Sequence, residues 1–445
     1  MENAPKPDAI ENRAASNKSE STRHESHLPL DGGRTAWIQV LGSFLINMNV
    51  YGLVNSFGDF QHFYETEYLS SYSSSAISWI GTVQGSLALF TGAIAGPIFD
   101  FGHFLLVLRV ASIMLAQGVF AGFCAGLMEV PSIALISDYF KKRTGLALGV
   151  AVSGAPIGGL VYSVVFRSVL GVAGFAWATR AVGFVVFTTL GIAMIIIKPQ
   201  DSRRRKERRV SLKMEAFRQA PILCIVLVAF FVWCAMLVPY FVTPAFAVSL
   251  GMSSTTSSYL IAVLNGAQFF GRVIPAWISD YSGAANMYLA GELLTGLLGL
   301  HWITVSTSGG LVEFLIFIGF ISGMLASLGP IIVPYVCRNN EWLGTYLGVV
   351  YAAAGLGVLI GNPVALATVG RGGRREDFLG AQLWMSLCAF VGAALFLIPR
   401  QEAKKTRLLV AEDGSGVRDS SPWQDLKRVT RTGLNWVWRR REVRN

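Results

Sequence analysis

The sequence predicts an all-α membrane protein built from two related helical halves. Hydrophobic residues make up 53% of the 445-residue chain and charged residues only 14%, whereas about a quarter of the residues in a soluble domain are charged. Stretches of about 20 apolar residues, the length that crosses a bilayer as a helix, recur along most of the chain. Related motifs also occur in both halves. Together these observations exclude a soluble globular domain.

The apolar stretches place the expected spans and divide the chain. We expect spans near residues 37–60, 77–99, 146–170 and 177–197, and then near 219–242, 258–279, 286–307, 311–336, 345–368 and 379–398. Residues 1–30 are predicted to be a disordered cytoplasmic tail, 31–197 the N-terminal helical half, 198–216 a basic cytoplasmic loop, 217–399 the C-terminal helical half and 400–445 a basic cytoplasmic tail. The cytoplasmic assignments follow from Lys and Arg, which favour the inner side of a membrane.

The stretch of residues 96–143 is too long for one crossing and too short for two comfortable ones. An internal repeat explains its length. Asp100 and Asp280, each at the end of a span, are 180 residues apart, whereas Gly149 and Gly348 are 199 apart. The first half is therefore 19 residues shorter between these landmarks, which is almost one helical crossing. The pattern predicts nominally 12 spans, with one span of the first half largely missing and about 11 apparent.

Two origins of the short segment remain open: the chain truly lacks the material, or the gene prediction has dropped it. In either case we expect one long tilted helix from about Gly102 to Leu127. We also expect the segment between Asp100 and Asp138 to be the least stable part of the fold, because backbone groups left unsatisfied in lipid are costly.

Several classes of function lack their sequence motifs. No GxxxxGK[ST] run is present, so no phosphate-binding loop for ATP is expected. The five cysteines form no CxxC pair and lie in or beside apolar segments, which predicts neither a metal site nor a disulfide framework. No nucleophile, base and orienting group occur together, so we do not expect an enzyme. We expect no cofactor, no nucleic acid and no obligate protein partner; the expected partners are a small organic solute and the lipid bilayer.

Two motifs in the first half resemble a known transporter family. "DGGRTAW" (Asp31–Trp37) immediately precedes the first span, and "YFKKRTGLALGVAVSG" (Tyr139–Gly154) leads into a later one. Together they resemble the two motifs of the monocarboxylate transporter family within the major facilitator superfamily. Fungal members look most similar, through "NSFGDFQHFYE", "SSAISWIGTVQGSL" and "GPIFDFG". The resemblance implies two six-helix halves that expose a solute site alternately to the two sides of the membrane.

The resemblance also carries three functional positions onto this chain. Proton-coupled members use a Lys late in the first span, and an Asp and an Arg four residues apart in the eighth. The Arg corresponds to Arg272, whereas Asn55 and Gln268 stand where the Lys and the Asp would be. One of the three is thus retained. The replacements predict weak dependence on a proton gradient, and an amphipathic metabolite as solute rather than a lactate-like acid.

Polar residues within the spans are candidates for binding the solute. Arg272 offers a guanidinium to a carboxylate or phenolate, or alternatively pairs with Asp280 or caps a helix end. Asn47, Tyr51 and Asn55 are four residues apart and share one helix face. That face either lines the solute cavity or bonds to a neighbouring helix. The candidate set for solute binding is completed by Gln84 and Gln268.

Four acidic residues are assigned other roles. Glu129 and Glu292 are the candidate proton carriers, because a carboxyl group buried in a span is often functional. Alternatively, Glu129 lies near a membrane interface. Asp100 and Asp280 are candidate gating residues, each expected to face the positive start of a neighbouring helix or a basic loop.

These features predict a secondary active or facilitative transporter that moves a small organic solute by alternating access. The solute is a monocarboxylate-like, riboflavin-like or secondary metabolite, and the location expected is the plasma membrane. A different class also fits the sequence: a membrane sensor that transports nothing, or the defective product of a truncated transporter gene. The short segment of the first half is the main support for that alternative.

Overall fold

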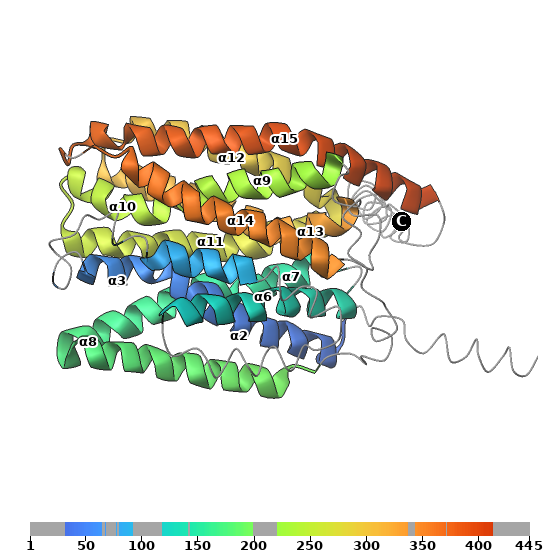
Figure 1. The fold of residues 1–445 in the computed structure, drawn as a ribbon, viewed down its shortest axis with the longest axis horizontal. Coiled ribbons are helices and arrows are strands. Elements are labelled where there is room, and N and C mark those ends of the chain that lie inside the picture. The colour runs from blue at the N-terminus through green and yellow to red at the C-terminus, as the bar shows by residue number, and fades with distance from the viewer. Residues whose placement is uncertain are drawn as a thin grey trace, which may run out of the picture.

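The computed structural model describes residues 32–64, 67, 77, 80–91, 118–140, 143–198, 220–336, 343–370 and 372–412. Within these residues every regular element is a helix. Seven of the described helices are long and apolar enough to cross a membrane. The helices run roughly along the long axis of the molecule (Figure 1). The prediction of an all-α membrane protein is confirmed, whereas the number of spans stays a prediction.

The helices form two groups, the first half below and the second half above in Figure 1. The labelled helices of the first half are α2 (Arg34–Asn55), α3 (Phe57–Phe63), α6 (Gly118–Tyr139), α7 (Thr144–Val152) and α8 (Gly154–Ile196); a short apolar helix covers Ile80–Thr91. Those of the second half are α9 (Ala220–Met236), α10 (Val238–Ser249), α11 (Ser254–Ser282), α12 (Ala284–Thr304), α13 (Ser308–Val336), α14 (Leu343–Ala367), the 3₁₀ turn η5 (Arg375–Phe378) and α15 (Leu379–Glu412).

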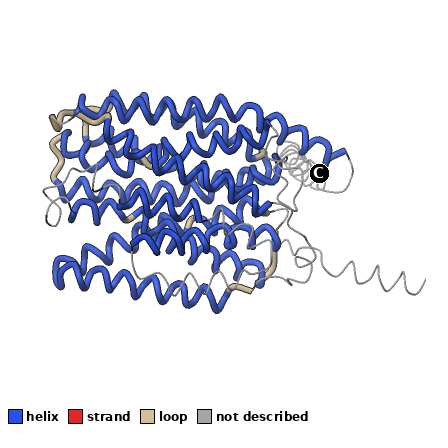
Figure 2. Tube along the Cα trace, in the orientation of Figure 1, coloured by secondary structure: helices blue, strands red, loops and turns tan. Residues whose placement is uncertain are grey.

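The element α8 contains two of the expected spans. Gly174 interrupts it with φ of 76° and ψ of 176°, a conformation that glycine adopts without the steric cost of a side chain. The chain reverses there and forms a helical hairpin, which is visible at the left end of the bundle in Figure 2. The break falls between the predicted spans 146–170 and 177–197, and it follows directly from the glycine.

Both halves use closely spaced glycines to pack two of their helices. On α8, a Cβ added at Gly158 would overlap the Met48 carbonyl of α2. On α14, a Cβ added at Gly357 would overlap the Phe230 carbonyl of α9. Gly158 and Gly357 are 199 residues apart, the spacing that relates Gly149 to Gly348. The repeat seen in the sequence is therefore a repeated helix contact, in which small residues let two backbones approach.

The short segment of the first half is described only from Gly118 onward. The helix α6 begins there, continues through Pro131 and ends at Tyr139. The predicted end of a long helix near Leu127 is therefore wrong, because the apolar run "VPSIALIS" beyond it remains helical. The rest of that predicted helix lies outside the described residues, as do Asp100, residues 1–30 and most of the two basic segments.

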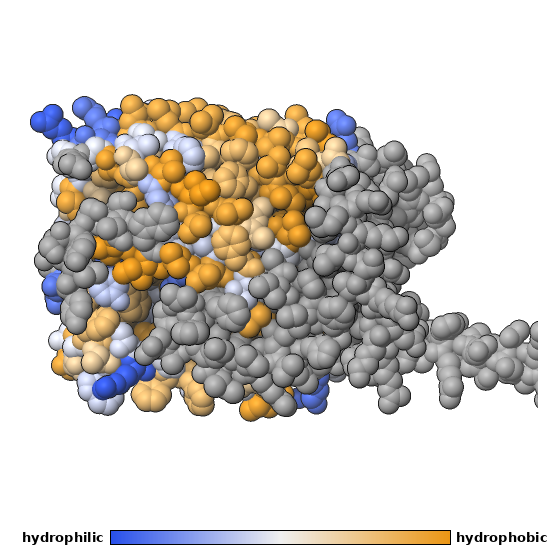
Figure 3. All heavy atoms as spheres, viewed as in Figure 1, coloured by the Kyte–Doolittle hydropathy of each residue, from blue (hydrophilic) through white to orange (hydrophobic). Residues whose placement is uncertain are grey.

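The outside of the bundle suits a lipid environment. Figure 3 shows hydrophobic side chains over the long faces, with the most hydrophilic residues gathered at the ends. Large apolar side chains stand fully outward on the second helix of the α8 hairpin, including Phe184 at 66% and Phe187 at 76% exposure. In water such a surface would be unfavourable, whereas lipid tails solvate it. The start of α2 and the end of α15 lie at the same end of the bundle (Figure 1).

Candidate functional site

A small cavity lies between the two halves. Its volume is about 10 Å³, room for roughly one water molecule. It is lined by Tyr51, Val54 and Asn55 of α2, Gly85 and Leu89 of the Ile80–Thr91 helix, Trp233 and Met236 of α9, Leu237 after it, Gln268 and Arg272 of α11, and Val358 of α14. Four of the six predicted solute-binding residues therefore meet at one place: Tyr51, Asn55, Gln268 and Arg272.

Arg272 is the central charge of this cavity and is only 5% exposed. Its Nη1 donates a hydrogen bond of 2.6 Å to the Val152 carbonyl at the end of α7, in the other half. Its Nη2 donates a longer one, 3.4 Å, to Gln268 Oε1. Gln268 Nε2 in turn donates to Ser322 Oγ of α13 at 3.4 Å. The Nε atom of Arg272 has no partner in the described part of the chain, so one donor of a buried cation is free for a ligand.

The alternative that Arg272 pairs with Asp280 does not match the geometry. Asp280 accepts hydrogen bonds from the backbone amides of Gly145, at 2.7 Å, and Leu146, at 3.0 Å. These amides belong to the first turn of α7, where unpaired N–H groups and the helix dipole favour a carboxylate. Asp280 thus joins the end of α11 to the start of a helix in the first half. The other gating candidate, Asp100, lies outside the described residues.

Glu129 of α6 is fully buried, 2% exposed, and lies in the same electrostatic neighbourhood as Arg272. It is flanked by the hydroxyl groups of Tyr51 of α2 and Tyr351 of α14. The Tyr51 hydroxyl and Glu129 Oε2 do not reach hydrogen-bonding distance of a partner within the described residues. The burial of Glu129 contradicts its alternative placement near a membrane interface, because the helix continues well past it on both sides.

Tyr51 and Trp233 stack across the boundary between the halves. Their ring centroids are 6.1 Å apart and the rings are inclined by 24°. Met48 and Phe230, whose carbonyls meet the equivalent glycines described above, are 182 residues apart, and so are Tyr51 and Trp233. The two rings therefore occupy equivalent positions in the two halves and stack on each other near the axis that relates them.

Several residues of the site escaped the sequence analysis. Asn265 of α11 is buried, and Gly159 of α8 faces both Asn265 and Asn55. The Nδ2 atom of Asn55 and the Oδ1 atom of Asn265 both lack partners among the described residues, so a donor and an acceptor remain available side by side. Tyr240 and Tyr351 also surround Arg272. The spacing of Asn265 and Gln268 on α11 could have indicated a shared face, but nothing in the sequence relates Tyr351 to it.

Two predicted solute-binding residues lie elsewhere. Asn47 is buried against α6, where its Nδ2 donates to the Ser43 carbonyl at 2.9 Å and to Ser132 Oγ at 3.5 Å. It therefore matches the helix-to-helix alternative and not a cavity position. Gln84 is half-buried and precedes the cavity-lining Gly85, without lining the cavity itself.

The halves touch on both sides of the cavity. On one side, Asp280 contacts α7, and an added Cβ at Gly149 would meet the Arg272 carbonyl at 2.6 Å. Towards the other end, the Arg167 guanidinium of α8 lies 5.1 Å from the Tyr259 ring centroid of α11. The Phe57 and Phe241 rings of α3 and α10 are 6.2 Å apart there. Contacts on both sides and a cavity of one water describe an occluded conformation.

A sequence model described as "Major Facilitator Superfamily" matches residues 35–341, more than half of the chain. The chain belongs to this superfamily. It is therefore a multi-pass membrane transporter and not an enzyme. The two halves that meet at Arg272 are those whose relative movement gives such transporters alternating access.

Similar proteins come from fungi. The chain is 32% identical over 403 residues to the aspyridones efflux protein apdF of Emericella nidulans, covering 85% of this chain and 82% of the relative. It is 33% identical over 352 residues to the MFS-type transporter dbaD of the same fungus, covering 75% and 79%. It is 28% identical over 398 residues to the agnestins efflux protein AgnL12 of Paecilomyces divaricatus, covering 84% and 89%. These relatives support the superfamily but not the monocarboxylate transporter family, so the narrower prediction lacks support.

Proposed function

We propose that this transporter exports an amphipathic secondary metabolite with an acidic group from the cell, across the plasma membrane. The carrying observation is the guanidinium of Arg272, buried between the halves with its Nε atom free, beside stacked aromatic rings. Buried donors of this kind favour a carboxylate or phenolate, and the rings and aliphatic side chains favour an apolar body. The names of the efflux relatives support the direction and the class of solute.

The contacts of Arg272 suggest how binding drives the conformational change. Its Nη1 holds the Val152 carbonyl of the first half, so an anionic solute that draws the guanidinium towards itself weakens a bond between the halves. The aromatic pair of Tyr51 and Trp233 must separate or slide to admit a solute larger than one water. The bonds from Asp280 to α7 then break for the cavity to open on that side. The solute acts by favouring one of these arrangements over the other.

Arg272→Ala should therefore lower transport by roughly 10- to 100-fold, the loss expected for a hydrogen bond to a charged group. Arg272→Lys keeps the charge but loses the planar fork, so it should also be impaired. The measurement is ATP-independent uptake of an aspyridone, an agnestin and lactate into inside-out membrane vesicles, corrected for the amount of transporter.

The matched control is Arg180→Ala, which removes an exposed arginine that contacts Trp177 on α8. It should transport like the parent protein. Transport by Arg272→Ala at the parental rate would overturn the role of Arg272. Uptake of lactate alone would instead restore the monocarboxylate hypothesis, and no uptake of any solute would favour a sensor.

A further inference from the structure

A second cavity lies inside the second half, away from the boundary between the halves. Its volume is also about 10 Å³, and α9, α12, α13 and α15 surround it. Glu292 of α12 lines it and is 1% exposed. Both carboxyl oxygens of Glu292 lack a hydrogen-bond partner in the part of the chain that the structure describes. A charge in such a place is costly and commonly marks a functional site.

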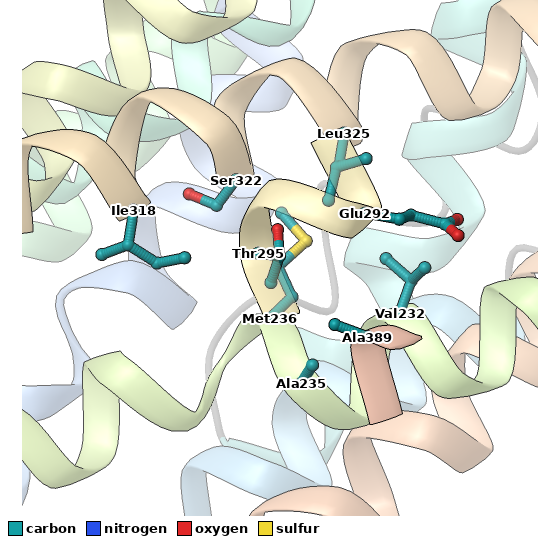
Figure 4. Close-up of a pocket in the computed structure, with 9 residues that line it drawn as sticks. All are labelled: Val232, Ala235, Met236, Glu292, Thr295, Ile318, Ser322, Leu325 and Ala389. Atoms are coloured by element: carbon teal, nitrogen blue, oxygen red, sulfur yellow. The ribbon is translucent and has the colours of Figure 1, made fainter. Parts of the chain in front are cut away.

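The surroundings of Glu292 decide what it can bind. Figure 4 shows its carboxyl group pointing away from the hydroxyls of Thr295 and Ser322, so these oxygens do not form a cage for a metal ion. The carboxyl instead lies against Val232 of α9 and Gly392 of α15. The described lining contributed by α9, α13 and α15 contains no charged group. Tyr288, one turn earlier on α12, is the titratable side chain that interacts with Glu292, and Cys234 and Cys388 contact each other instead.

The second cavity is connected to the solute cavity by one side chain and one polar chain. Met236 lines both cavities and separates them. Ser322 lines the second cavity and accepts the hydrogen bond from Gln268, which in turn accepts one from Arg272. Met236 is also the last residue of α9, and Leu237 separates α9 from α10. A shift of α9 at this break would change both cavities together.

We propose that Glu292 is a proton-binding site in the second half, separate from the solute site and coupled to it through α9. A proton adds to the carboxylate oxygen to give the neutral acid, which the dry cavity accommodates. Loss of that proton leaves an anion that requires water, and the opening that admits water moves α9 and Met236. The proton is exchanged with solvent, so no other reactant is needed. The coupling rests on the proposed function, whereas the proton site does not.

Infrared difference spectroscopy of the purified full-length protein tests the site without any solute. A carboxylic acid band that titrates with pH should be present in the parent and lost in Glu292→Gln. It should persist in Glu129→Gln, which removes the other buried candidate, and in Glu313→Gln, an exposed glutamate on α13. If Glu292→Gln fails to fold, Glu292→Asp should keep a titrating band with an altered midpoint. An identical spectrum in Glu292→Gln and the parent overturns the proposal.

The coupling is tested in proteoliposomes with an imposed pH gradient. Flux of an aspyridone should respond to the gradient in the parent, and the response should be lost in Glu292→Gln and weakened in Ser322→Ala. A gradient response retained in Glu292→Gln overturns the coupling. A titrating band without flux of any solute would refute the proposed function and leave the proton site standing.

Discussion

The two halves of the bundle share a packing framework but not their polar residues. Gly158 of the first half and Gly357 of the second make the same kind of helix contact, and Tyr51 and Trp233 occupy equivalent positions. The charges do not repeat: Arg272 and Glu292 lie in the second half and Glu129 in the first. The repeat thus accounts for how the halves are built and move, whereas the chemistry of the site comes from residues that break the repeat.

The largest effect should come from breaking the shared framework. Leucine at Gly158 or at Gly357 would overlap a backbone carbonyl of the neighbouring helix, and overpacking commonly costs about 1–3 kcal/mol or more. Both variants should lose folded protein, measured by size-exclusion chromatography in detergent. Gly171→Leu is the control, because an added Cβ there meets nothing within 4 Å. Normal folding of Gly158→Leu with failure of Gly357→Leu would show that the two contacts are not equivalent.

The next effect concerns the length difference between the halves. Two full crossings need about 40 residues before any turn, and only 37 lie between Asp100 and Asp138. Inserting the missing stretch of about 19 residues from a relative, between Asp100 and Gly118, should supply a complete crossing. Expression and the melting temperature of the purified protein should both rise. If both fall, the short form is an adaptation of this chain and the hypothesis of a dropped segment is wrong.

The sequence predicted those features that depend on local residues. Gly174 marks the turn between two spans, and the position of Asp280 at a helix end anticipated its contact with a helix start. Asn47 shows where such reasoning stops: its spacing places it on the face of Tyr51 and Asn55, but Ser132 of α6 takes its side chain. Tyr351 was missed because its proximity to Glu129 depends on how α14 and α6 meet, which no local pattern encodes. The residues that meet across the boundary could be found only after the halves were packed together.

A smaller effect should follow from Asp280→Asn. The change keeps the shape of the side chain but removes a negative charge from the first turn of α7, an interaction worth about 0.3–1 kcal/mol. The contact between the halves should open about 2- to 5-fold more readily, measured as faster labelling of a cysteine placed at Ala276. Asp377→Asn is the control, because Asp377 accepts from the Arg374 amide within one half. Slower labelling in Asp280→Asn would contradict a closing role for Asp280.

The smallest effect should be the coupling between the two equivalent rings, Tyr51 and Trp233. Aromatic pairs contribute about 0.5–1.5 kcal/mol beyond the area they bury, and here the two partners belong to halves that must move apart. A double-mutant cycle with leucine at each position should give a coupling energy of about that size in thermal unfolding of the solute-free protein. The same cycle on the transport rate should give a coupling of opposite sign, because the stack stabilises the occluded form that solute entry must disrupt.

The Trp302 and Phe314 rings provide the matched control for that cycle. They stack 4.7 Å apart at 22°, but both belong to the second half. Their cycle should show coupling in unfolding and none in transport. If both pairs behave alike, the stack between Tyr51 and Trp233 is simply part of the packing. If only the pair between the halves affects transport, the rings act as a contact that must part before a solute can enter. That result would place the step limiting solute entry where the two halves meet.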